Sequence, residues 1–440
     1  MNQFKKYLEY SIYLLVFILP FQTRFIFKQG ELADKYWEYG TISLYVSTVF
    51  LLLSLSLFAL YYFKEDLKAY QGRFRLPFFW SLVIGLDIFV FLSIFLAPDP
   101  VLALYRYAIF LLGVGWGFLI IKAPFSRVKL FYFFLAGLFF HSCLALFQFL
   151  TQSAPASKYL GLSGHDPSEL GVSVVEAVGR DGLAERWLRA YGGLDHPNIL
   201  GGVLVVALLL LLGLFSRNYF KSRNARAVGY LTFLVFFSAL LFSFSRTAVL
   251  ALLAGVLIFL AGKAWQGRWP EVKRSLGALG LALIVSVVFL FSYQNLIDAR
   301  LGGGGRLELK SSQERAVHQY QAGELFQENY LLGVGIGNYT LALSESGQES
   351  FSWNYQPVHN TFLLVLTEVG IFAFVFFISI PLYLFFKSFR QGNIFNLAIL
   401  TSLVIMLMFD HWWWSLYFGV LFFWMLLALI YGNLKEKPRL

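Results

Sequence analysis

Long apolar stretches separated by short polar segments fill this chain from one end to the other. A helix that crosses the hydrocarbon core of a bilayer needs about 20 largely apolar residues, and about twelve stretches approach that length. The pattern therefore predicts an all-α integral membrane protein with about twelve transmembrane helices. These spans lie near residues 8–27, 41–63, 77–96, 101–121, 128–151, 198–215, 227–244, 246–262, 275–292, 360–386, 392–409 and 414–432.

Two of the polar segments are too long to be simple turns, and long loops of this kind commonly carry function. In the second loop, the polar stretch near 311–328 spaces Val317, Tyr320 and Phe326 for one helix face. We expect this helix to lie on the membrane surface. The predicted parts are transmembrane helices one to five at 1–151, a periplasmic loop at 152–197, helices six to nine at 198–292, a larger periplasmic loop with the amphipathic helix at 293–359, and helices ten to twelve with a cytoplasmic tail at 360–440.

The distribution of basic residues predicts the orientation of these helices. If both termini are cytoplasmic, the inside segments hold 22 of the 35 lysines and arginines, the short outside segments hold five, and the two long loops hold eight. Because short cytoplasmic segments are enriched in positive charge, this orientation is favoured, and both long loops then face away from the cytoplasm. The net charge of +10 therefore reflects topology, and we expect no nucleic-acid partner.

Three predicted helices begin with polar residues on the outer side, at 195–198, 245–247 and 359–361. The backbone N–H groups at a helix start, together with the positive end of the helix dipole, favour an anion. A guanidinium group adds a planar pair of donors that matches a phosphate. Since Arg189 and Arg315 lie in the adjoining loops, the pattern predicts a site for a phosphate group.

Arginines beside one histidine suit a transfer away from a phosphate leaving group. Arg246, at the second helix start, would take up the developing negative charge together with the loop arginines. His359, at the third, would remove a proton from the attacking hydroxyl. This scheme requires no metal ion.

Each of these residues also has a simpler interpretation. Arg246 at a membrane boundary could extend its side chain to the lipid headgroups, and His359 could cap a helix. Arg189 and Arg315, taken singly, suit solvated loop charges. Only their convergence in space would favour a functional site.

Two further motifs have structural interpretations. The glycine-rich run Gly333–Gly337 resembles a nucleotide-binding loop, but no strand–helix unit surrounds it. We therefore expect a loop packed tightly under the predicted helix at 360–386. The run Trp412–Trp414 suits an aromatic belt at the outer membrane interface.

Four short stretches between residues 189 and 370 occur in an order that is typical of one family. They are Arg189 to Gly192 with His196 to Asn198; Ser243 to Arg246; Arg315 followed by Gly333 to Asn338; and His359-Asn360 with Glu368 to Gly370. In this order the second half of the chain resembles the O-antigen ligase and polymerase family. Its members are membrane glycosyltransferases that handle polyprenyl-diphosphate-linked glycans at the outer face of the bacterial inner membrane.

The resemblance implies a GT-C-like membrane fold and assigns roles to three residues. The matching arginines, Arg246 and Arg315, are expected to hold the diphosphate, and the matching His359 is expected to act at the acceptor hydroxyl. The implied reaction is inverting and uses no metal or other cofactor, because the acceptor sugar displaces undecaprenyl diphosphate directly. The polar residues that we expect to bind substrate around these three are Arg189, His196, Asn198, Ser245 and Asn360.

Within this family we favour an O-antigen ligase. His359-Asn360 and Gly370 stand at the spacing that ligases often show, although Ala373 departs from the Gly, Thr or Tyr that usually follows. The expected partners are an undecaprenyl-diphosphate-linked glycan donor, a lipid A-core acceptor and membrane lipids. We expect a monomer in the bacterial inner membrane, with cytoplasmic termini and a periplasmic site.

Three other functions stay open at this stage. A polysaccharide polymerase and a protein O-oligosaccharyltransferase would use the same arginine and histidine residues on a different acceptor. A transporter also commonly has twelve helices, but transporters place their site near the bilayer midplane between repeated halves. Here the polar residues gather at the outer boundary, and no repeat is evident.

Overall fold

The computed structural model describes residues 2–33, 35–65, 76–178, 184–302, 306–347 and 355–435, and helices make up most of them. Three two-stranded sheets and two short 3-10 helices complete the fold. The helices are α1 Asn2–Ile18, α2 Val46–Glu65, α3 Phe78–Ser93, α4 Pro100–Lys122, α5 Arg127–Thr151, α6 Pro197–Ser216, α7 Arg223–Phe242, α8 Arg246–Trp265, α9 Trp269–Ser292, α10 Gln294–Leu301, α11 Arg306–Glu328, α12 Tyr339–Glu345, α13 Thr361–Arg390, α14 Ile394–Phe409, α15 Trp412–Ser415 and α16 Tyr417–Lys435. The remaining elements are β1 Arg24–Lys28, β2 Glu31–Leu32, β3 Lys35–Tyr36, β4 Ile42–Tyr45, β5 Val174–Val178, β6 Ala184–Leu188, η1 Glu38–Gly40 and η2 Ile94–Leu96.

The helical membrane fold is confirmed. Within the described ranges, ten helices are long and apolar enough to cross a bilayer: α2 to α9, α13 and α16. Helix α3 reaches 19 residues together with η2, whereas the apolar helix α14 has 16 residues and α1 has 17. The exact count of twelve spans therefore stays a prediction.

The first predicted span, at 8–27, is wrong at both ends. Helix α1 begins at Asn2 and ends at Ile18, because Pro20 disfavours helical geometry in the residue before it. The aromatic and β-branched run that follows forms strand β1, which pairs antiparallel with β4. That pairing also takes the first residues of the second predicted span, since α2 begins only at Val46.

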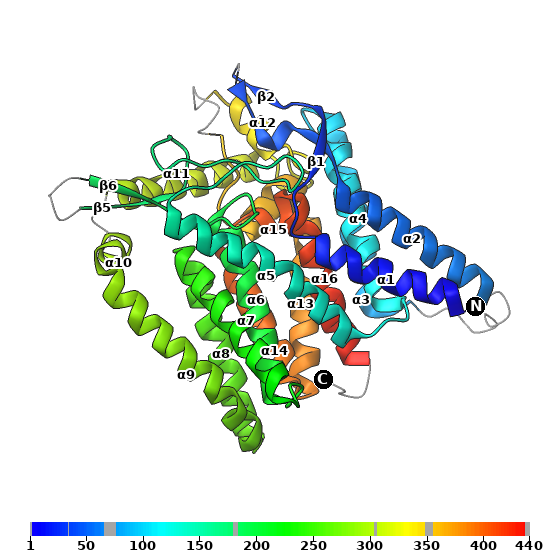
Figure 1. Cartoon of the computed structure of the whole chain (residues 1–440). Coiled ribbons are helices and arrows are strands. Elements are labelled where there is room, and N and C mark those ends of the chain that lie inside the picture. Colours follow the sequence, from blue (N-terminus) through cyan, green and yellow to red (C-terminus); the bar gives the residue numbers. More distant parts are fainter. Residues whose placement is uncertain are drawn as a thin grey trace.

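The bundle is organised around α6 and α16, whose membrane-length windows are entirely buried, whereas the corresponding window of α9 is only 11% buried. Figure 1 accordingly places α9 along the edge of the bundle. A Cβ on Gly201 would stand 2.8 Å from the Ala248 Cβ. The glycine therefore lets the beginnings of α6 and α8 approach closely, as small residues commonly do between membrane helices.

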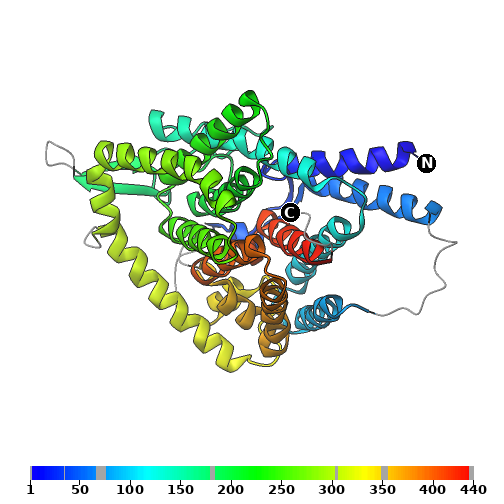
Figure 2. The ribbon, with the colours of Figure 1, turned by 90° about the horizontal axis from the view of Figure 1, so that it is seen from below.

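One end of the bundle carries most of the non-spanning elements. In Figure 1 the strands, α11, α12 and α15 gather at this end. The view from below, Figure 2, shows that the long helix α11 runs across the bundle, since its axis is seen side-on where neighbouring helices are seen end-on. The polar segments predicted to carry function therefore lie together.

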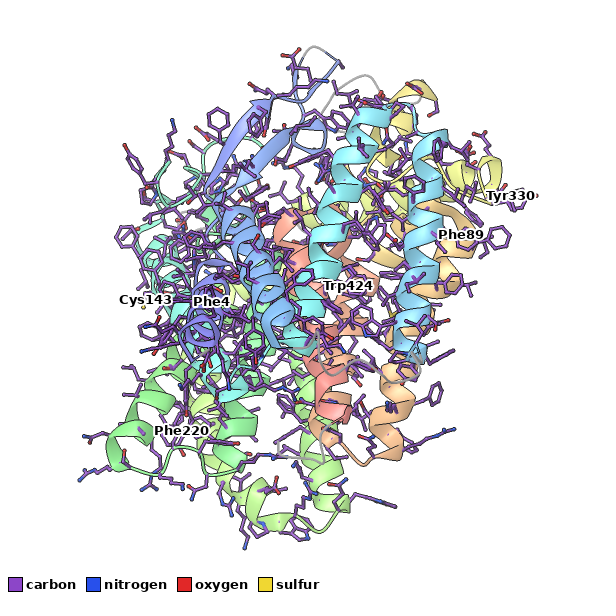
Figure 3. The ribbon with its side chains drawn as sticks, turned by 90° about the vertical axis from the view of Figure 1, so that its right-hand side faces the viewer. Phe4, Phe89, Cys143, Phe220, Tyr330 and Trp424 are labelled. Atoms are coloured by element: carbon purple, nitrogen blue, oxygen red, sulfur yellow. The ribbon has the colours of Figure 1, made fainter. Side chains whose placement is uncertain are left out.

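The glycine-rich loop packs against a break in α13, as predicted. Gly370 has a φ of +75° inside α13, and a Cβ there would lie 2.2 Å from the Leu331 carbonyl oxygen. The loop donates hydrogen bonds into the break, from Gly335 N to Glu368 O at 2.8 Å and from Gly337 N to the Glu368 carboxylate at 2.8 Å. Tyr330, just before the loop, lies at the edge of the protein in Figure 3.

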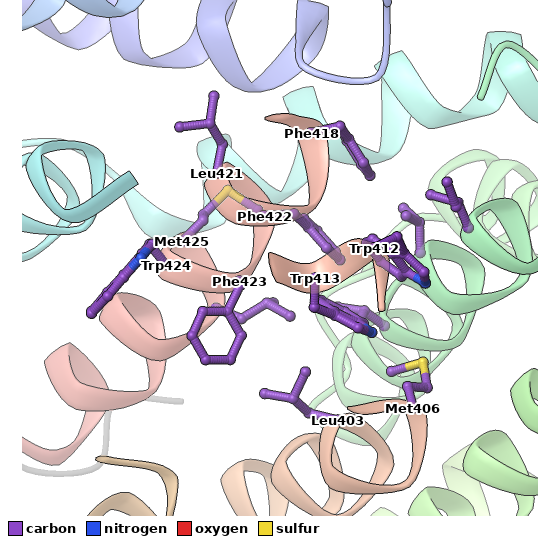
Figure 4. Close-up of a cluster of buried hydrophobic side chains, with 14 of the residues drawn as sticks. Leu403, Met406, Trp412, Trp413, Phe418, Leu421, Phe422, Phe423, Trp424 and Met425 are labelled. Carbon is purple, nitrogen blue, oxygen red and sulfur yellow. The ribbon is translucent and has the colours of Figure 1, made fainter. Parts of the chain in front are cut away.

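The predicted aromatic belt at Trp412–Trp414 is wrong. Figure 4 shows Trp412 and Trp413 inside a cluster of buried side chains that includes Phe418 and Phe422, and their exposed fractions are 2% and 1%. The chain reverses here between α14 and α16, and the two indole rings stack with centroids 3.9 Å apart. The tryptophans therefore fill the interior of the turn instead of facing lipid.

Candidate active site

A shared carboxylate joins two arginines at the end of the bundle that carries the non-spanning elements. Arg246 is the first residue of α8, and its Nη2 lies 2.8 Å from Glu308 Oε2. Arg300, on α10, pairs through Nη1 with the other oxygen of the same carboxylate. Arg246 also donates from Nη1 to the Arg300 carbonyl oxygen at 3.2 Å. Glu308, with a side chain only 9% exposed, thus holds guanidinium groups from two separate helices.

Two further arginines bring positive charge to this pair. Arg189 is buried and donates from Nε to Ser243 O at 2.8 Å. Burial lowers the pKa of Arg189 to about 9, and the positive charges of Arg300 and Arg315 add to that lowering. Arg315 has a buried Nε that makes no hydrogen bond with any described residue. Four guanidinium groups and one carboxylate therefore share this region, which leaves an excess of positive charge.

Asp410 connects this cluster to the histidine. Asn198 accepts a hydrogen bond from Arg189 Nη2 at 2.7 Å and donates one to Asp410 Oδ2 at 3.1 Å. The other carboxylate oxygen, Oδ1, lies 3.7 Å from His359 Nδ1. A continuous path of polar groups therefore leads from Arg189 to His359.

The electrostatic environment keeps Asp410 ionised. Burial by itself raises the pKa of this carboxyl, but contact with His359 and the proximity of His411 and His196 outweigh burial and hold the pKa well below its usual range. The 3.7 Å separation from His359 is an ion-pair distance, longer than a hydrogen bond. A small closure would give the arrangement in which a carboxylate orients an imidazole and stabilises its protonated form.

Neutral histidines surround this pair. His411 lies beside His359 with ring centroids 5.1 Å apart. Burial lowers the pKa of both His411 and His196 to about 3, so both are neutral at neutral pH and become charged only in the acid range in which Asp410 titrates. His359, whose side chain is 25% exposed, has access to the surface, whereas His411 is buried.

The chain matches a known family over the region that contains much of this site. Residues 231–378 match the family model described as O-antigen ligase. Over this segment, about a third of its length, the chain is similar to the O-antigen ligase family. No curated protein matches the sequence. The match supports a ligase- or polymerase-type activity on membrane glycan and lipid substrates.

The O-antigen ligase match includes part of the site and excludes the rest. Arg246, Arg300, Arg315 and His359 fall inside residues 231–378. The buried connections that join them, through Arg189, Asn198 and Asp410, come from outside that range. The site is therefore assembled from the matched segment, from the residue that follows β6, from the start of α6 and from the end of α14.

The three predicted polar helix starts are confirmed, and their residues cap the helices. His196 Nδ1 accepts from Asn198 N at 3.1 Å at the start of α6, where Pro197 is the first helical residue. Ser245 Oγ accepts from Ala248 N at 3.4 Å at the start of α8. These contacts use the polar atoms in the way expected of N-caps.

Asn360 caps α13 through a hydrogen bond from Leu363 N at 3.1 Å. The predicted substrate contacts of His196, Ser245 and Asn360 thus compete with structural hydrogen bonds and stay predictions. Asn198 also has protein partners on both sides, as described above.

The predicted polar helix near 311–328 is present as α11 and begins earlier, at Arg306. Its buried face carries His318, Ala322 and Leu325. Val317 and Tyr320 point away from the protein and are 46% and 67% exposed. Phe326, the third residue predicted for the same face, is only partly exposed. The position of this helix at a membrane interface therefore stays a prediction.

Sequence reasoning missed Arg300, Glu308 and Asp410. Arg300 and Glu308 lie in the second long loop without a recognisable spacing. Asp410 offered a better signal, because it is a carboxylate at the end of a predicted span, and ionisable groups in such positions are functional hypotheses by default.

Proposed function

We propose that the protein is an O-antigen ligase that transfers a glycan from undecaprenyl diphosphate to lipid A-core at the periplasmic face of the inner membrane. The observation that carries this proposal is the group of four nearby arginines, one of which, Arg189, is linked through Asn198 and Asp410 to His359. The arginine group suits a diphosphate, and the histidine suits an attacking hydroxyl.

In the proposed donor complex, the diphosphate replaces Glu308 as the counter-ion of Arg246 and Arg300. Both guanidinium groups now point their donors at the Glu308 carboxylate, so they already face an anion. A diphosphate carries more charge and more acceptor oxygens than a carboxylate, and paired guanidinium donors bind such oxygens in a bidentate manner. Arg189 and Arg315 supply the additional positive charge.

An open groove beside α10 offers a route for the donor. It has a volume of about 670 Å³ between the β5–β6 hairpin and the junction of α9 and α10, and its lining includes Trp187, Tyr293 and Asn295. The adjoining surface of α9 exposes Leu283, and Phe291 is 83% exposed. We propose that the polyprenyl chain lies against this apolar face while its diphosphate reaches Arg300.

The proposed reaction is a single displacement at the anomeric carbon. The acceptor oxygen forms a bond to that carbon as the bond to the diphosphate oxygen breaks, and the electron pair leaves with the diphosphate. His359 takes the hydroxyl proton, and ionised Asp410 stabilises the imidazolium that forms. The arginines stabilise the charge on the leaving group. Attack opposite the leaving group inverts the anomeric configuration.

The inner-membrane location and orientation are part of the proposal. The excess of basic residues in the segments on the side of the termini supports cytoplasmic ends. The site lies at the opposite end of the bundle, where the predicted outer segments and α11 gather (Figure 1). This arrangement suits a reaction on lipids in the outer leaflet.

A product assay tests the proposal and separates the alternatives. Purified protein in lipid nanodiscs receives a radiolabelled undecaprenyl-diphosphate glycan together with lipid A-core, a second lipid-linked donor, or an unfolded protein acceptor. The proposal expects glycosylated lipid A-core and free undecaprenyl diphosphate. Product from the second donor alone would identify a polymerase, and product on protein alone would identify a protein glycosyltransferase.

A further inference from the structure

His359, Asp410 and His411 place metal-binding atoms close together. One ligand atom from each of these residues lies within 4.8 Å of the other two. We propose that this group binds a divalent transition-metal ion such as Zn²⁺, and that the bound ion inhibits transfer. The inhibition rests on the proposed function, whereas the binding does not.

The ligand types select the class of ion. Two imidazoles and one carboxylate suit Zn²⁺ and its neighbours in the transition series, while Mg²⁺ and Ca²⁺ prefer sets made of oxygen alone. Three protein ligands leave a fourth position for water, as in zinc sites that stay open to solvent. The 25% exposed side chain of His359 gives an ion access from the surface.

The hydrogen bonds of His411 leave one ring nitrogen free for a metal. The Ser415 hydroxyl donates to the His411 carbonyl oxygen at 3.1 Å. Its oxygen, 2.7 Å from His411 Nδ1, then accepts the Nδ1 proton. The lone pair is consequently on Nε2. A fixed tautomer of this kind is what metal-binding histidines usually have.

Asp410 and His359 also each present an atom that could bind a metal ion. Asn198 holds Oδ2 of Asp410 and leaves Oδ1 facing His359. His359 Nδ1 is buried and makes no hydrogen bond within the described part of the chain. With metal–ligand bonds of about 2.0–2.2 Å, tetrahedral ligands stand roughly 3.4 Å apart. The ligand atoms need to approach by on the order of 1 Å, which a small rotation of the His359 ring can supply.

A bound ion would block the proposed chemistry at both members of the pair. It would occupy the His359 nitrogen that faces Asp410, and it would neutralise the carboxylate that stabilises the imidazolium. Transfer would therefore stop until the ion is removed. A chelator added to metal-free protein would change nothing.

Binding of Co²⁺ to the purified, metal-stripped protein tests the site without any activity assay. Tetrahedral Co²⁺ has visible absorption bands that octahedral aqueous Co²⁺ lacks, and Zn²⁺ should abolish them by displacement. We expect one Co²⁺ per chain with this spectrum. His411→Ala should remove the bands, and Ser415→Ala should weaken binding by about 10- to 100-fold, the usual effect of losing a group that orients a ligand.

His165→Ala is the matched control, because this histidine of the first long loop stacks on Tyr191 and is not one of the three ligands. It should bind Co²⁺ as the parent protein does. Size-exclusion profiles and helical circular dichroism establish that each variant is folded, and His411→Gln repeats the test with a side chain closer in size. An octahedral spectrum, or equal binding by the His411 variants and the parent, would overturn the inference.

Activity gives the second measurement. Zn²⁺ should abolish transfer by the parent protein, and EDTA should restore it. If metal-free protein transfers no glycan although Co²⁺ binds as expected, the proposed function fails and the metal site stands. If transfer proceeds and Zn²⁺ at saturating concentration leaves it unchanged, the inhibitory site is wrong.

Discussion

The site has an arginine half and a histidine half, and the two differ in their electrostatics. In the arginine half, Arg246 and Arg300 share one carboxylate, and two further guanidinium groups lie near enough to affect each other's charge. In the histidine half, one ionised carboxylate, Asp410, is surrounded by imidazoles, two of which burial keeps neutral. The first half attracts an anion, and the second can accept a proton. Asn198 touches both, so the two functions are held at a fixed separation.

Removing the imidazole is the strongest way to break the histidine half. His359→Ala should lower kcat/KM by about 10²–10⁴-fold, the usual contribution of a general base, while donor binding by the arginine half persists. Glycan transfer and binding of labelled donor, measured on the same preparation, check the two effects. His165→Ala serves as control. Turnover like that of the parent protein would exclude His359 from catalysis.

Breaking the arginine half should remove both binding and transfer. Arg246→Ala and Arg315→Ala should each lower kcat/KM by about 10²–10³-fold, the effect of losing one preorganised donor to developing charge. Lysine should restore little, because a point charge lacks the planar pair of donors. Arg306→Ala is the matched control, since this arginine is 74% exposed and pairs with Glu176. A similar loss in the control would indicate a general charge effect.

Asp410→Asn sharpens the comparison, because it removes a charge and keeps the shape. Transfer should fall by about 10- to 100-fold, in line with the roughly 1.5–3 kcal/mol of a hydrogen bond to a charged group. The folded-state pKa of Asp410 lies below its usual value, so its contribution to stability is complete above about pH 4 and is lost as pH falls toward the folded pKa.

Thermal unfolding in detergent between pH 6 and pH 3 measures that contribution. The parent protein should lose more stability over this range than Asp410→Asn does. Identical pH profiles would mean that the carboxylate has no special ionisation in the folded protein.

The sequence could predict the helices and the arginine half, and it could not predict how the halves are joined. Apolar length identified the spans, and proline, serine and asparagine marked the starts of α6, α8 and α13, because these residues have local effects on a helix end. Arg246 and Arg315 were named from the family resemblance, and their role in binding the diphosphate stays a prediction.

Other features depended on contacts between distant segments. Glu308 forms an ion pair with Arg246, although helices α8, α9 and α10 separate the two residues in the sequence. Asp410, which follows α14, forms a hydrogen bond with Asn198 at the start of α6. No spacing in the sequence encodes such pairs. Trp412 and Trp413 show the same limit, because composition cannot distinguish an aromatic ring that faces lipid from one that fills a turn.

Glu308→Gln tests the most specific difference between the halves, namely that the arginine half already contains a competing anion. If the diphosphate must displace Glu308 from Arg246 and Arg300, neutralising this side chain should lower the donor KM by about three- to tenfold, which corresponds to roughly 0.7–1.4 kcal/mol. Steady-state kinetics with varied donor measure KM and kcat separately.

Glu314→Gln is the control, because this residue of α11 is 52% exposed and pairs with Lys310. A purely structural Glu308 predicts the opposite sign, since guanidinium groups released from their anchor would bind donor less well and raise KM. The direction of the change in KM therefore distinguishes a carboxylate that holds the place of the substrate from one that only positions its neighbours.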